Sequence, residues 1–311
     1  MKQPSFSFVM PAYKAEYLSK AINSVLNQDY NNFELIIVND ASPENLKEIV
    51  KGFQDNRIRY YENTQNIGGK DLIKNWNYCV SMAENDYIIL ATDDDIFEPC
   101  FLSNAKKLIE KYPNVDVIRS GVKKIDEKEN VLDIEFPLKE HMSAKEFVLF
   151  YAKGGTISCI SNYIFRRTSL NKNGGFISFP RAHFSDDATA LALSLNGVAC
   201  IPSNDFCFRV SNINLSNQTN ISIVIDQIKA TELYMTWYLK HIATIDDNKD
   251  LFFERACYGG FKSKYINIIS TLLFKIPISN YFSIYKYTIN NKHLFTKEKI
   301  KLLLFYLIEK L

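Results

Sequence analysis

The first 120 residues alternate between short apolar runs and segments whose apolar residues recur every three or four positions. The short runs predict strands at residues 6–10, 33–38, 58–61, 87–91 and 115–118, and the pattern at 33–38 is that of a buried strand. The segments between them predict helices at 18–26, from Ser42 with that residue as the cap, at 71–83 and from Pro99. Because strands that alternate with helices pair in parallel, this order predicts an α/β fold. Its mainly parallel, Rossmann-like sheet should carry helices on both faces.

The second half of the chain is less regular. Its pattern predicts a helix at 144–151 capped by Ser143, a strand at 158–166, a helix at 187–196 and a mobile loop over the Ser- and Asn-rich segment 203–222. From residue 223 onward the apolar positions are those of amphipathic helices. We therefore expect an α/β domain over residues 1–222, with halves 1–120 and 121–222, and a helical extension over 223–311.

Composition narrows the classes of function. The 311 residues carry a formal charge of +2, which argues against nucleic acid as a partner of the whole molecule. The charge is uneven, because residues 249–311 contain 11 Lys and Arg residues against 4 Asp and Glu residues. The six cysteines are scattered without a CxxC pair, which predicts reduced cytoplasmic thiols rather than a zinc ribbon. We also expect neither a secretory signal nor a membrane-spanning helix.

Polar residues directly follow three of the predicted strands. They are Tyr13, the pair Asn39-Asp40, and the triplet Asp93-Asp94-Asp95. In parallel α/β sheets ligands bind outside the carboxyl ends of the strands, so these residues should border one site. Adjacent carboxylates repel one another, and a bound Mg²⁺ or Mn²⁺ would relieve that repulsion. The alternative is an acidic cluster that only favours the start of the next helix.

Several segments, taken in order, resemble family 2 glycosyltransferases. They are Phe8-Val9-Met10-Pro11-Ala12-Tyr13, Ser24-Val25-Leu26-Asn27-Gln28, residues 33–42, Asn66-Ile67-Gly68, Lys74-Asn75, residues 84–88 and residues 91–99. The last segment resembles the DxD region of that family, in the Thr-Asp-Asp form of its spore-coat polysaccharide members. The resemblance is strong from residue 5 to about 120, weaker to about 216 and absent from the tail.

This resemblance implies a GT-A fold, a nucleotide-sugar donor and metal-dependent sugar transfer with inversion. Carried over by position, Asp40 would contact the base of the donor, Pro11-Ala12-Tyr13 would line the base pocket, and Asp93 would contact the ribose. Asp94 would bind Mn²⁺ or Mg²⁺, with Asp95 beside it as a second metal candidate. The chain departs from the family pattern at Asn39, where Asp is usual, and at Thr92, where the DxD usually begins.

The resemblance also implies a catalytic base in Ser185-Asp186-Asp187, counted back from Gly197. A carboxylate there would remove the proton of the acceptor hydroxyl as its oxygen attacks the anomeric carbon of the sugar. Asp186 takes the base position, and Asp187 is the alternate. In the structural alternative, Ser185 caps a helix and both acids only favour its start.

Four further residues are candidates for contact with the donor. Gly68 and Lys70 precede a helix and suit phosphate, although such a pair more often forms a plain turn. Asn75 belongs to the helix that follows. Arg209 suits a diphosphate, and a structural ion pair is the equal alternative.

The tail combines positive charge with an apolar helix face. Thr296 predicts the start of a helix whose apolar face carries Ile300, Leu303, Leu304, Leu307, Ile308 and Leu311, flanked by Lys297, Lys299, Lys301 and Lys310. Such helices lie on anionic membrane surfaces. The alternatives are packing on the α/β domain or on a second copy in a homodimer.

Together these features favour a cytoplasmic transferase, peripheral on the inner face of the cell membrane, that builds bacterial surface glycans. Its donor would be a nucleotide sugar, UDP-linked by resemblance, and its acceptor a glycan or a lipid-linked saccharide. Metal-dependent phosphohydrolases and nucleotidyltransferases also cluster aspartates, but they give no reason for Asn39-Asp40 or for Asp186. A non-catalytic nucleotide-sugar-binding module should lack the base or the metal acid, and both are present.

Overall fold

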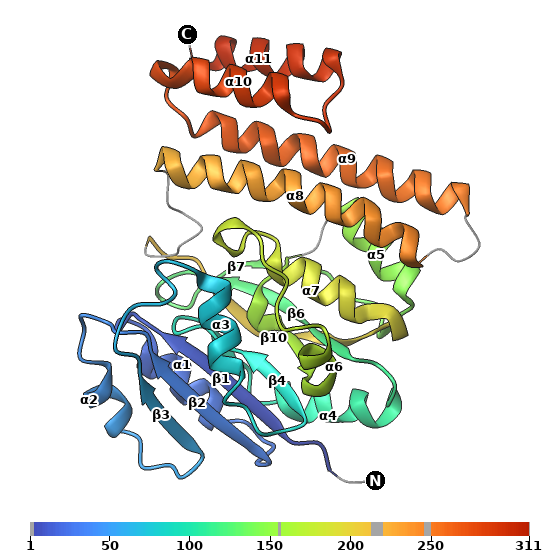
Figure 1. Cartoon of the computed structure of the whole chain (residues 1–311). Coiled ribbons are helices and arrows are strands. Elements are labelled where there is room, and N and C mark those ends of the chain that lie inside the picture. Colours follow the sequence, from blue (N-terminus) through green and yellow to red (C-terminus); the bar gives the residue numbers. More distant parts are fainter. Residues whose placement is uncertain (1–2, 155–156, 213–219, 246–249, 311) are drawn as a thin grey trace. The chain divides into compact units, whose positions relative to one another are not determined.

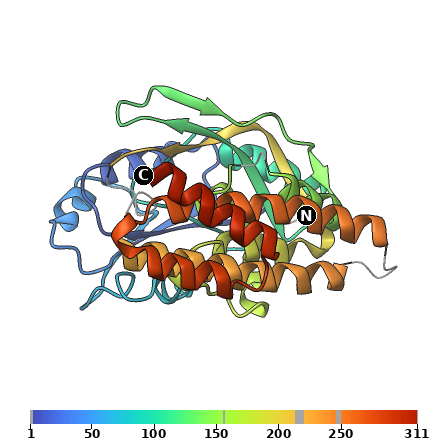
Figure 2. The same ribbon diagram turned by 90° about the horizontal axis from the view of Figure 1, so that it is seen from above.

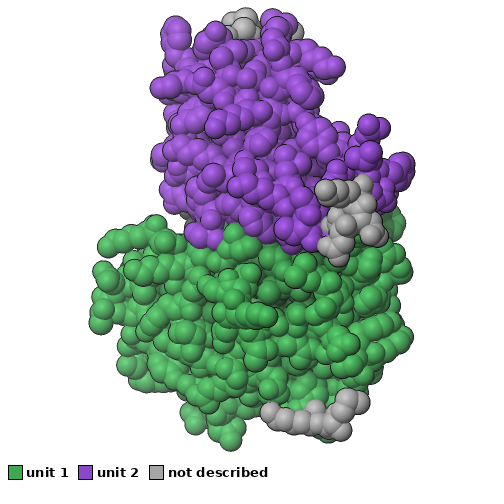
Figure 3. All heavy atoms as spheres, turned by 45° about the vertical axis from the view of Figure 1, so that its right-hand side comes forward, with its two compact units in different colours: residues 1–147, 156–177, 185–212 green, residues 148–155, 178–184, 213–311 purple. Residues whose placement is uncertain are grey.

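The computed structural model describes residues 3–154, 157–212, 220–245 and 250–310. The chain divides into two compact units, which are coloured separately in Figure 3. Unit 1 contains residues 1–147, 156–177 and 185–212, and unit 2 contains residues 148–155, 178–184 and 213–311. The domain boundary predicted at residue 222 thus lies beyond Asn212, the last residue of unit 1.

Unit 1 is built on one mixed sheet of ten strands (Figure 1). The strand order is β3-β2-β1-β4-β9-β6-β10-β5, with β7 paired to β6 and β8 to β10. The strands are β1 (Phe6–Ala12), β2 (Phe33–Asn39), β3 (Ile58–Glu62), β4 (Tyr87–Leu90), β5 (Ile96–Phe97), β6 (Val117–Ile125), β7 (Val131–Ile134), β8 (His141–Met142), β9 (Tyr163–Arg166) and β10 (Val198–Arg209). The first four strands are parallel, as the sequence predicts. In the other half β10 is parallel to β6, whereas β5, β7, β8 and β9 run antiparallel to their partners.

Helices cover this sheet, and one aromatic cluster fills much of the core. The helices of unit 1 are α1 (Leu18–Leu26), α2 (Leu46–Lys51), α3 (Leu72–Val80), α4 (Phe101–Lys111), α6 (Arg167–Lys172) and α7 (Ser185–Leu193). The ring of Phe8 in β1 meets that of Phe33 edge-on at 5.8 Å and that of Phe97 at 5.1 Å. Burying such rings supplies much of the free energy that stabilises a core. This packing joins β1 to Phe33 at the start of β2 and to Phe97 in β5.

Two of the predicted elements begin four or five residues later than predicted. Helix α2 starts at Leu46 rather than at Ser42, because the side chain of Asn45 accepts from an N–H of the first turn and acts as the cap. The hydroxyl of Ser42 donates instead to the carbonyl of Tyr13. The strand predicted at 158–166 is confined to its second half, since residues 160–162 form a 3₁₀ turn.

The prediction of a mobile loop from residue 203 is wrong for its first seven residues. Ser203–Arg209 is the second part of β10, and its parallel pairing with β6 runs from Phe206 opposite Val122 to Arg209 opposite Ile125. Residues 213–219 lie outside the described part of the chain. Pairing with a strand about 80 residues earlier overrides the loop composition of this segment.

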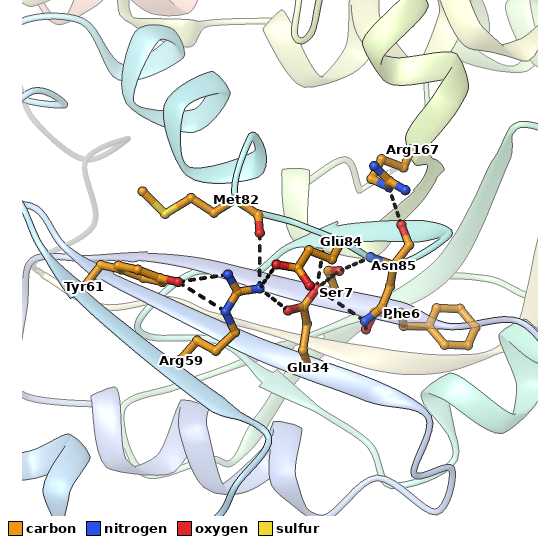
Figure 4. A network of polar contacts seen from close by, with 9 residues as sticks. All are labelled: Phe6, Ser7, Glu34, Arg59, Tyr61, Met82, Glu84, Asn85 and Arg167. Atoms are coloured by element: carbon orange, nitrogen blue, oxygen red, sulfur yellow. Dashed lines mark hydrogen bonds and ion pairs between the residues drawn. The ribbon is translucent and has the colours of Figure 1, made fainter.

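A polar network holds the amino ends of the parallel strands together (Figure 4). The Glu34 carboxylate accepts from the Ser7 hydroxyl at 2.6 Å and from the Glu84 N–H at 2.9 Å, and it pairs with Arg59 at 2.7 Å. Burial alone would raise the pKa of Glu34, but these hydrogen bonds outweigh burial and hold it below its usual value. The network joins β1, β2, β3 and the start of β4 at the edge opposite their carboxyl ends.

Unit 2 is helical. It contains α8 (Ile221–Ile245), α9 (Leu251–Phe274), α10 (Tyr281–Asn290) and α11 (Thr296–Lys310), with most of α5 (Ala144–Lys153). Helices α8 and α9 run side by side, and α11 packs on α9 (Figure 2). The rings of Tyr238 and Phe261 stack at 4.2 Å between α8 and α9. No helix among the described residues is long and apolar enough to cross a membrane.

The predicted apolar face of the last helix is divided by this packing. Leu303 is buried together with Leu302 and Tyr306, whereas Ile300 and Leu304 are exposed, so the face predicted to be continuous is not one surface. The side chains of Leu307, Ile308, Lys310 and Leu311 lie outside the described part.

Candidate active site

Asp40, just beyond the end of β2, organises the loop that follows β3. Its Oδ1 accepts from the Asn63 side chain at 2.7 Å and from the Ile67 N–H at 2.9 Å, and its Oδ2 accepts from the Gly68 N–H at 2.7 Å. A Cβ atom at Gly68 would lie 3.0 Å from Asp40 Oδ2 and 3.1 Å from Asn75 Nδ2. Asp40, Gly68 and Asn75 therefore converge, and glycine leaves the room that lets them do so.

The end of β1 lies beside Asp40. The carbonyl of Ala12 accepts from the Asp40 N–H at 2.9 Å, and Ala12 is buried next to half-buried Pro11. The side chains of Tyr13 and Lys70 are exposed, and the N–H of Lys70 closes a turn on Ile67 O at 3.0 Å. Among these donor-side candidates, Tyr13 and Lys70 are the side chains most open to a ligand.

Asp93 joins the carboxyl ends of β1 and β4. Its Oδ2 accepts from the N–H groups of Tyr13 at 2.7 Å and Lys14 at 2.8 Å. Burial and the charge of Asp94 raise the pKa of Asp93, while the two backbone N–H groups oppose that shift. Asp93 thus fixes the backbone on which the predicted base pocket is built.

Asp95 and Arg209 form a second buried connection. Asp95 accepts from the Thr92 hydroxyl and, at 2.8 Å, from the Arg209 N–H. Burial and the charge of Asp94 raise the pKa of Asp95. The fully buried Arg209 guanidinium donates to Asp94 O at 2.8 Å, pairs with Glu129 at 3.4 Å and lies over the ring of Tyr17. These contacts favour the structural alternative for Arg209 over contact with a diphosphate.

Asp94 is the member of the triplet that the geometry fits to a metal. Its carboxylate faces the ammonium of Lys14 at 3.4 Å, so the place already attracts a cation. Among the described residues no three His, Cys, Asp or Glu side chains are arranged to hold a metal by themselves. Mg²⁺ and Mn²⁺ need only one or two carboxylates where phosphates of a substrate complete the shell. Asp94 would then hold the metal, and the contacts of Asp95 favour a supporting role.

The two acids of the predicted base stand at the start of α7. Asp187 is buried and accepts from the Ser158 hydroxyl at 2.6 Å, and Asp186 is half-buried and accepts from the Asp187 N–H at 2.9 Å. The positive end of the helix dipole stabilises both charges. Asp186 is the more accessible carboxylate, which suits a group that meets an acceptor.

Segment 158–163 lies between these acids and the aspartate triplet. The hydroxyls of Thr92 and Ser161 are 3.4 Å apart. Burial, followed by the charges of Asp95, Asp186 and Asp187, raises the pKa of the Cys159 thiol well above its usual value. The charges of both acidic groups thus act on one half-buried thiol, so the structure brings together residues that are about 90 positions apart in the sequence.

Comparison with known proteins identifies the family of the chain. The model of the family described as glycosyl transferase family 2 matches residues 7–174, which is more than half of the chain. The chain belongs to this family. This family 2 member is 34% identical over 128 residues to a Bacillus subtilis protein assigned as the glycosyltransferase EpsE. It is 36% identical over 113 residues to WcaA of Escherichia coli, which is assigned to colanic acid biosynthesis.

These matches are partial. They cover 40% and 34% of this family 2 chain and 45% and 39% of the two relatives, so the chain spans less than half of the length of each. The likeness is to the family as a whole, and the resemblance to spore-coat members is minor beside it.

Solved structures show the fold. Staphylococcus aureus TarS in complex with UDP-GlcNAc aligns with a TM-score of 0.63 at 17% identity, covering 96% of this chain and 89% of TarS. A Pyrobaculum calidifontis mannosyltransferase in complex with GDP-Man and Mn²⁺ aligns with a TM-score of 0.53 at 14% identity, covering 100% of this chain and 88% of that one. The GT-A fold expected from the sequence is confirmed, with a helical region after it.

Several residues of this family 2 site escaped the sequence analysis. Lys14 pairs with Asp94 and directly follows the Pro11-Ala12-Tyr13 motif, and that position in the sequence is the signal that could have identified it. Asn63 and Ser158 carry no motif, and their contacts join segments that are distant in the sequence.

Proposed function

We propose that this protein is a metal-dependent, inverting glycosyltransferase. It moves a sugar from a nucleotide sugar, UDP-linked, to a hydroxyl of a glycan or lipid-linked saccharide in bacterial surface polysaccharide synthesis. The observation that carries the proposal is the meeting of two acidic groups around segment 158–163. The first group, Asp93-Asp94-Asp95, lies at the carboxyl ends of the parallel strands, where ligands bind in sheets of this kind. The second group, Asp186 and Asp187, lies at the start of α7.

On the donor side, residues of this chain bind and orient the nucleotide sugar. Asp40, Gly68 and Asn75 shape the base pocket together with Pro11-Ala12-Tyr13, Asp93 lies at the ribose, and Lys70 reaches toward the phosphates. Asp94 would hold Mn²⁺ or Mg²⁺ against the diphosphate, and such a metal neutralises charge as the diphosphate departs. The Mn²⁺ in the mannosyltransferase complex supports a divalent metal here.

On the acceptor side, the chemistry is a proton transfer coupled to substitution. Asp186 takes the proton of the acceptor hydroxyl while that oxygen forms a bond to the anomeric carbon from the face opposite the phosphate. The bond between the anomeric carbon and the phosphate oxygen breaks, and the nucleoside diphosphate leaves with its electron pair. Attack from the opposite face inverts the anomeric configuration.

A thermal-shift series tests the donor class. UDP with Mn²⁺ should raise the melting temperature more than GDP or ADP with Mn²⁺, because a ligand that binds only the folded state stabilises it. The control is each nucleotide with EDTA, which should remove most of the shift. A clear preference for ADP would contradict a UDP-sugar donor, and release of sugar as fast without an acceptor as with one would indicate a hydrolase.

We also propose that helices α10 and α11 of unit 2 contact the inner surface of the membrane. Phe282, Tyr285 and Ile289 lie one turn apart along α10 and are exposed, and Phe282 is 85% exposed. Lys286 is exposed on the same helix, and Lys297 and Lys301 are exposed on α11. Aromatic residues beside lysines match a surface of anionic lipids, which would bring the enzyme to a lipid-linked acceptor.

Vesicle sedimentation tests this contact. The protein should bind vesicles rich in phosphatidylglycerol, bind pure phosphatidylcholine weakly, and lose binding when Phe282→Ser and Lys286→Glu are combined. Phe136→Ser is the matched control, since Phe136 in unit 1 is 87% exposed. Equal binding by the double variant would rule out this surface, and a parent dimer that the variant dissociates would assign it to a second copy.

A further inference from the structure

A buried ion pair in unit 1 stands apart from the residues so far assigned. Arg119 in β6 and Glu135, just after β7, are both almost completely inaccessible to solvent. Arg119 Nη2 donates to Glu135 Oε1 at 2.8 Å and to Oε2 at 3.1 Å. Arg119 Nε and Nη1 are also buried, and they have no hydrogen-bond partner among the residues that the structure describes.

This pair is a costly way to fill a core. Removing two charges from water is expensive, and hydrophobic residues of similar volume often serve stability equally well. Buried N–H groups without partners add to the cost. The pair therefore calls for an explanation beyond stability, and its remaining contacts supply one.

Those contacts fix both sides of a single residue, Ile157. Arg119 Nη2 donates to the carbonyl of Ile157 at 2.7 Å, and the N–H of Ile157 donates to Glu135 Oε1 at 3.1 Å. Glu135 is itself held, because its Oε2 accepts from the Val122 N–H at 3.2 Å and its carbonyl accepts from the Asn204 side chain at 3.0 Å. The backbone at Ile157 is thus fixed to two strands of the sheet.

The next residue carries this constraint to the acids of α7. Ser158 donates its hydroxyl to Asp187 Oδ1 at 2.6 Å, and it also lies 3.2 Å from the hydroxyl of Tyr163. The N–H of Asp187 donates in turn to Asp186 Oδ1 at 2.9 Å. An unbroken series of contacts therefore runs from the buried pair through Ile157 and Ser158 to Asp186.

We infer that the Arg119–Glu135 pair is a positioning unit for the catalytic base, acting through the Ile157 backbone and the Ser158 hydroxyl. Arg119, Glu135 and Ser158 touch neither donor nor acceptor in this scheme. They hold Asp187, and through it Asp186, in the orientation that meets the acceptor hydroxyl. The inference rests on the proposed function, because it requires Asp186 to act as the base.

Ser158→Ala is the decisive variant, since it removes one hydroxyl and leaves the ion pair intact. We expect kcat to fall about tenfold with the affinity for UDP and Mn²⁺ unchanged, because a base displaced by a fraction of an ångström is less effective. The acidic limb of the pH profile of kcat/KM should also move, because it reports the ionisation of Asp186, and the neighbouring Asp187 loses the hydrogen bond that holds it. Ser158→Thr keeps a hydroxyl and should restore most of both.

Ser5→Ala is the matched control. Ser5 also donates its hydroxyl to an aspartate, Asp86, at 2.9 Å, but it does so at the amino ends of the strands. It should leave kcat and the pH profile unchanged. Arg119→Lys keeps the charge but cannot bond Glu135 and the Ile157 carbonyl in the same way. If this variant folds, its kcat and pH profile should resemble those of Ser158→Ala. If it does not fold, Ser158→Ala alone tests the positioning role.

The outcomes separate this inference from the proposed function. Normal transfer by Asp186→Asn and Asp187→Asn would overturn both, because no base would remain to be positioned. Impaired transfer by Asp186→Asn together with a normal kcat and pH profile in Ser158→Ala would overturn the positioning role alone. Lowered stability of Ser158→Ala without a change in kcat or in the pH profile would likewise assign the contact to structure.

Discussion

Asp186→Asn should lower sugar transfer by a factor on the order of 10² to 10⁴, the usual range for loss of a general base. Asn has the size of Asp but cannot take the proton of the acceptor hydroxyl. Asp186 is half-buried at the start of α7, and in the proposed reaction it acts only on the acceptor hydroxyl, so binding of UDP with Mn²⁺ should be normal. Transfer rates and calorimetric binding of UDP, measured side by side, check both parts.

Asp187→Asn is the control one position along. Asn at this position can still accept from the Ser158 hydroxyl, so the variant should keep the local geometry and lose only a modest part of the transfer rate. The reverse ranking of the two variants would assign the base to Asp187. Near-normal transfer by both would exclude a base in this segment.

Asp94→Ala should abolish the part of donor binding that depends on Mn²⁺. A metal that Asp94 no longer holds cannot link the protein to a diphosphate, and damage to a metal site commonly costs roughly 10- to 100-fold in affinity. The fold should survive, because Asp94 lies beyond the end of β4 and its carboxylate pairs only with Lys14 among the described residues. Titration of UDP with and without Mn²⁺ gives the measurement.

Asp116→Ala is the corresponding control. Asp116 also forms an ion pair, with Arg166 at 2.9 Å, but it precedes β6 at the amino edge of the sheet. Its loss should leave UDP binding at the parental value with and without Mn²⁺. Should Asp94→Ala bind UDP and Mn²⁺ as well as this control does, the metal assignment is wrong.

The parallel half of the fold was predictable because its signals are local. Strands β1, β2 and β4 are mostly apolar runs, and β3 is a short segment of Ile and Tyr that carries an Arg and a Glu. A pattern within ten residues is sufficient to find each of them. The second half depends on distant partners. Ser203–Arg209 has the composition of a loop and becomes a strand only because β6 lies beside it. The local pattern also predicted the wrong cap for α2, because the Ser42 hydroxyl donates to the Tyr13 carbonyl and Asn45 caps the helix instead.

The sequence was sufficient to predict which residues lie at the site, but not which contacts each of them makes. Three adjacent aspartates look equivalent in a sequence, yet Asp93 binds backbone N–H groups, Asp95 binds Thr92 and Arg209, and Asp94 faces Lys14. Side chains at the end of a strand point in different directions, and no spacing rule states which one faces a ligand. The supporting residue Ser158 could not be found at all, since it meets Asp187 across 29 positions without a motif.

The contact between Arg209 and Asp95 also sets an order of events during synthesis. Arg209 follows Asp95 by 114 residues, so a growing chain contains the whole acidic triplet long before its partner exists. Strands β1 to β4 need only the first 90 residues, and a domain made from its amino end can begin to assemble them first. Until β10 has left the ribosome, Asp95 lacks the N–H that holds it. The donor half can therefore take shape early in translation, whereas the acidic triplet is completed by one of the last parts of unit 1 to be made.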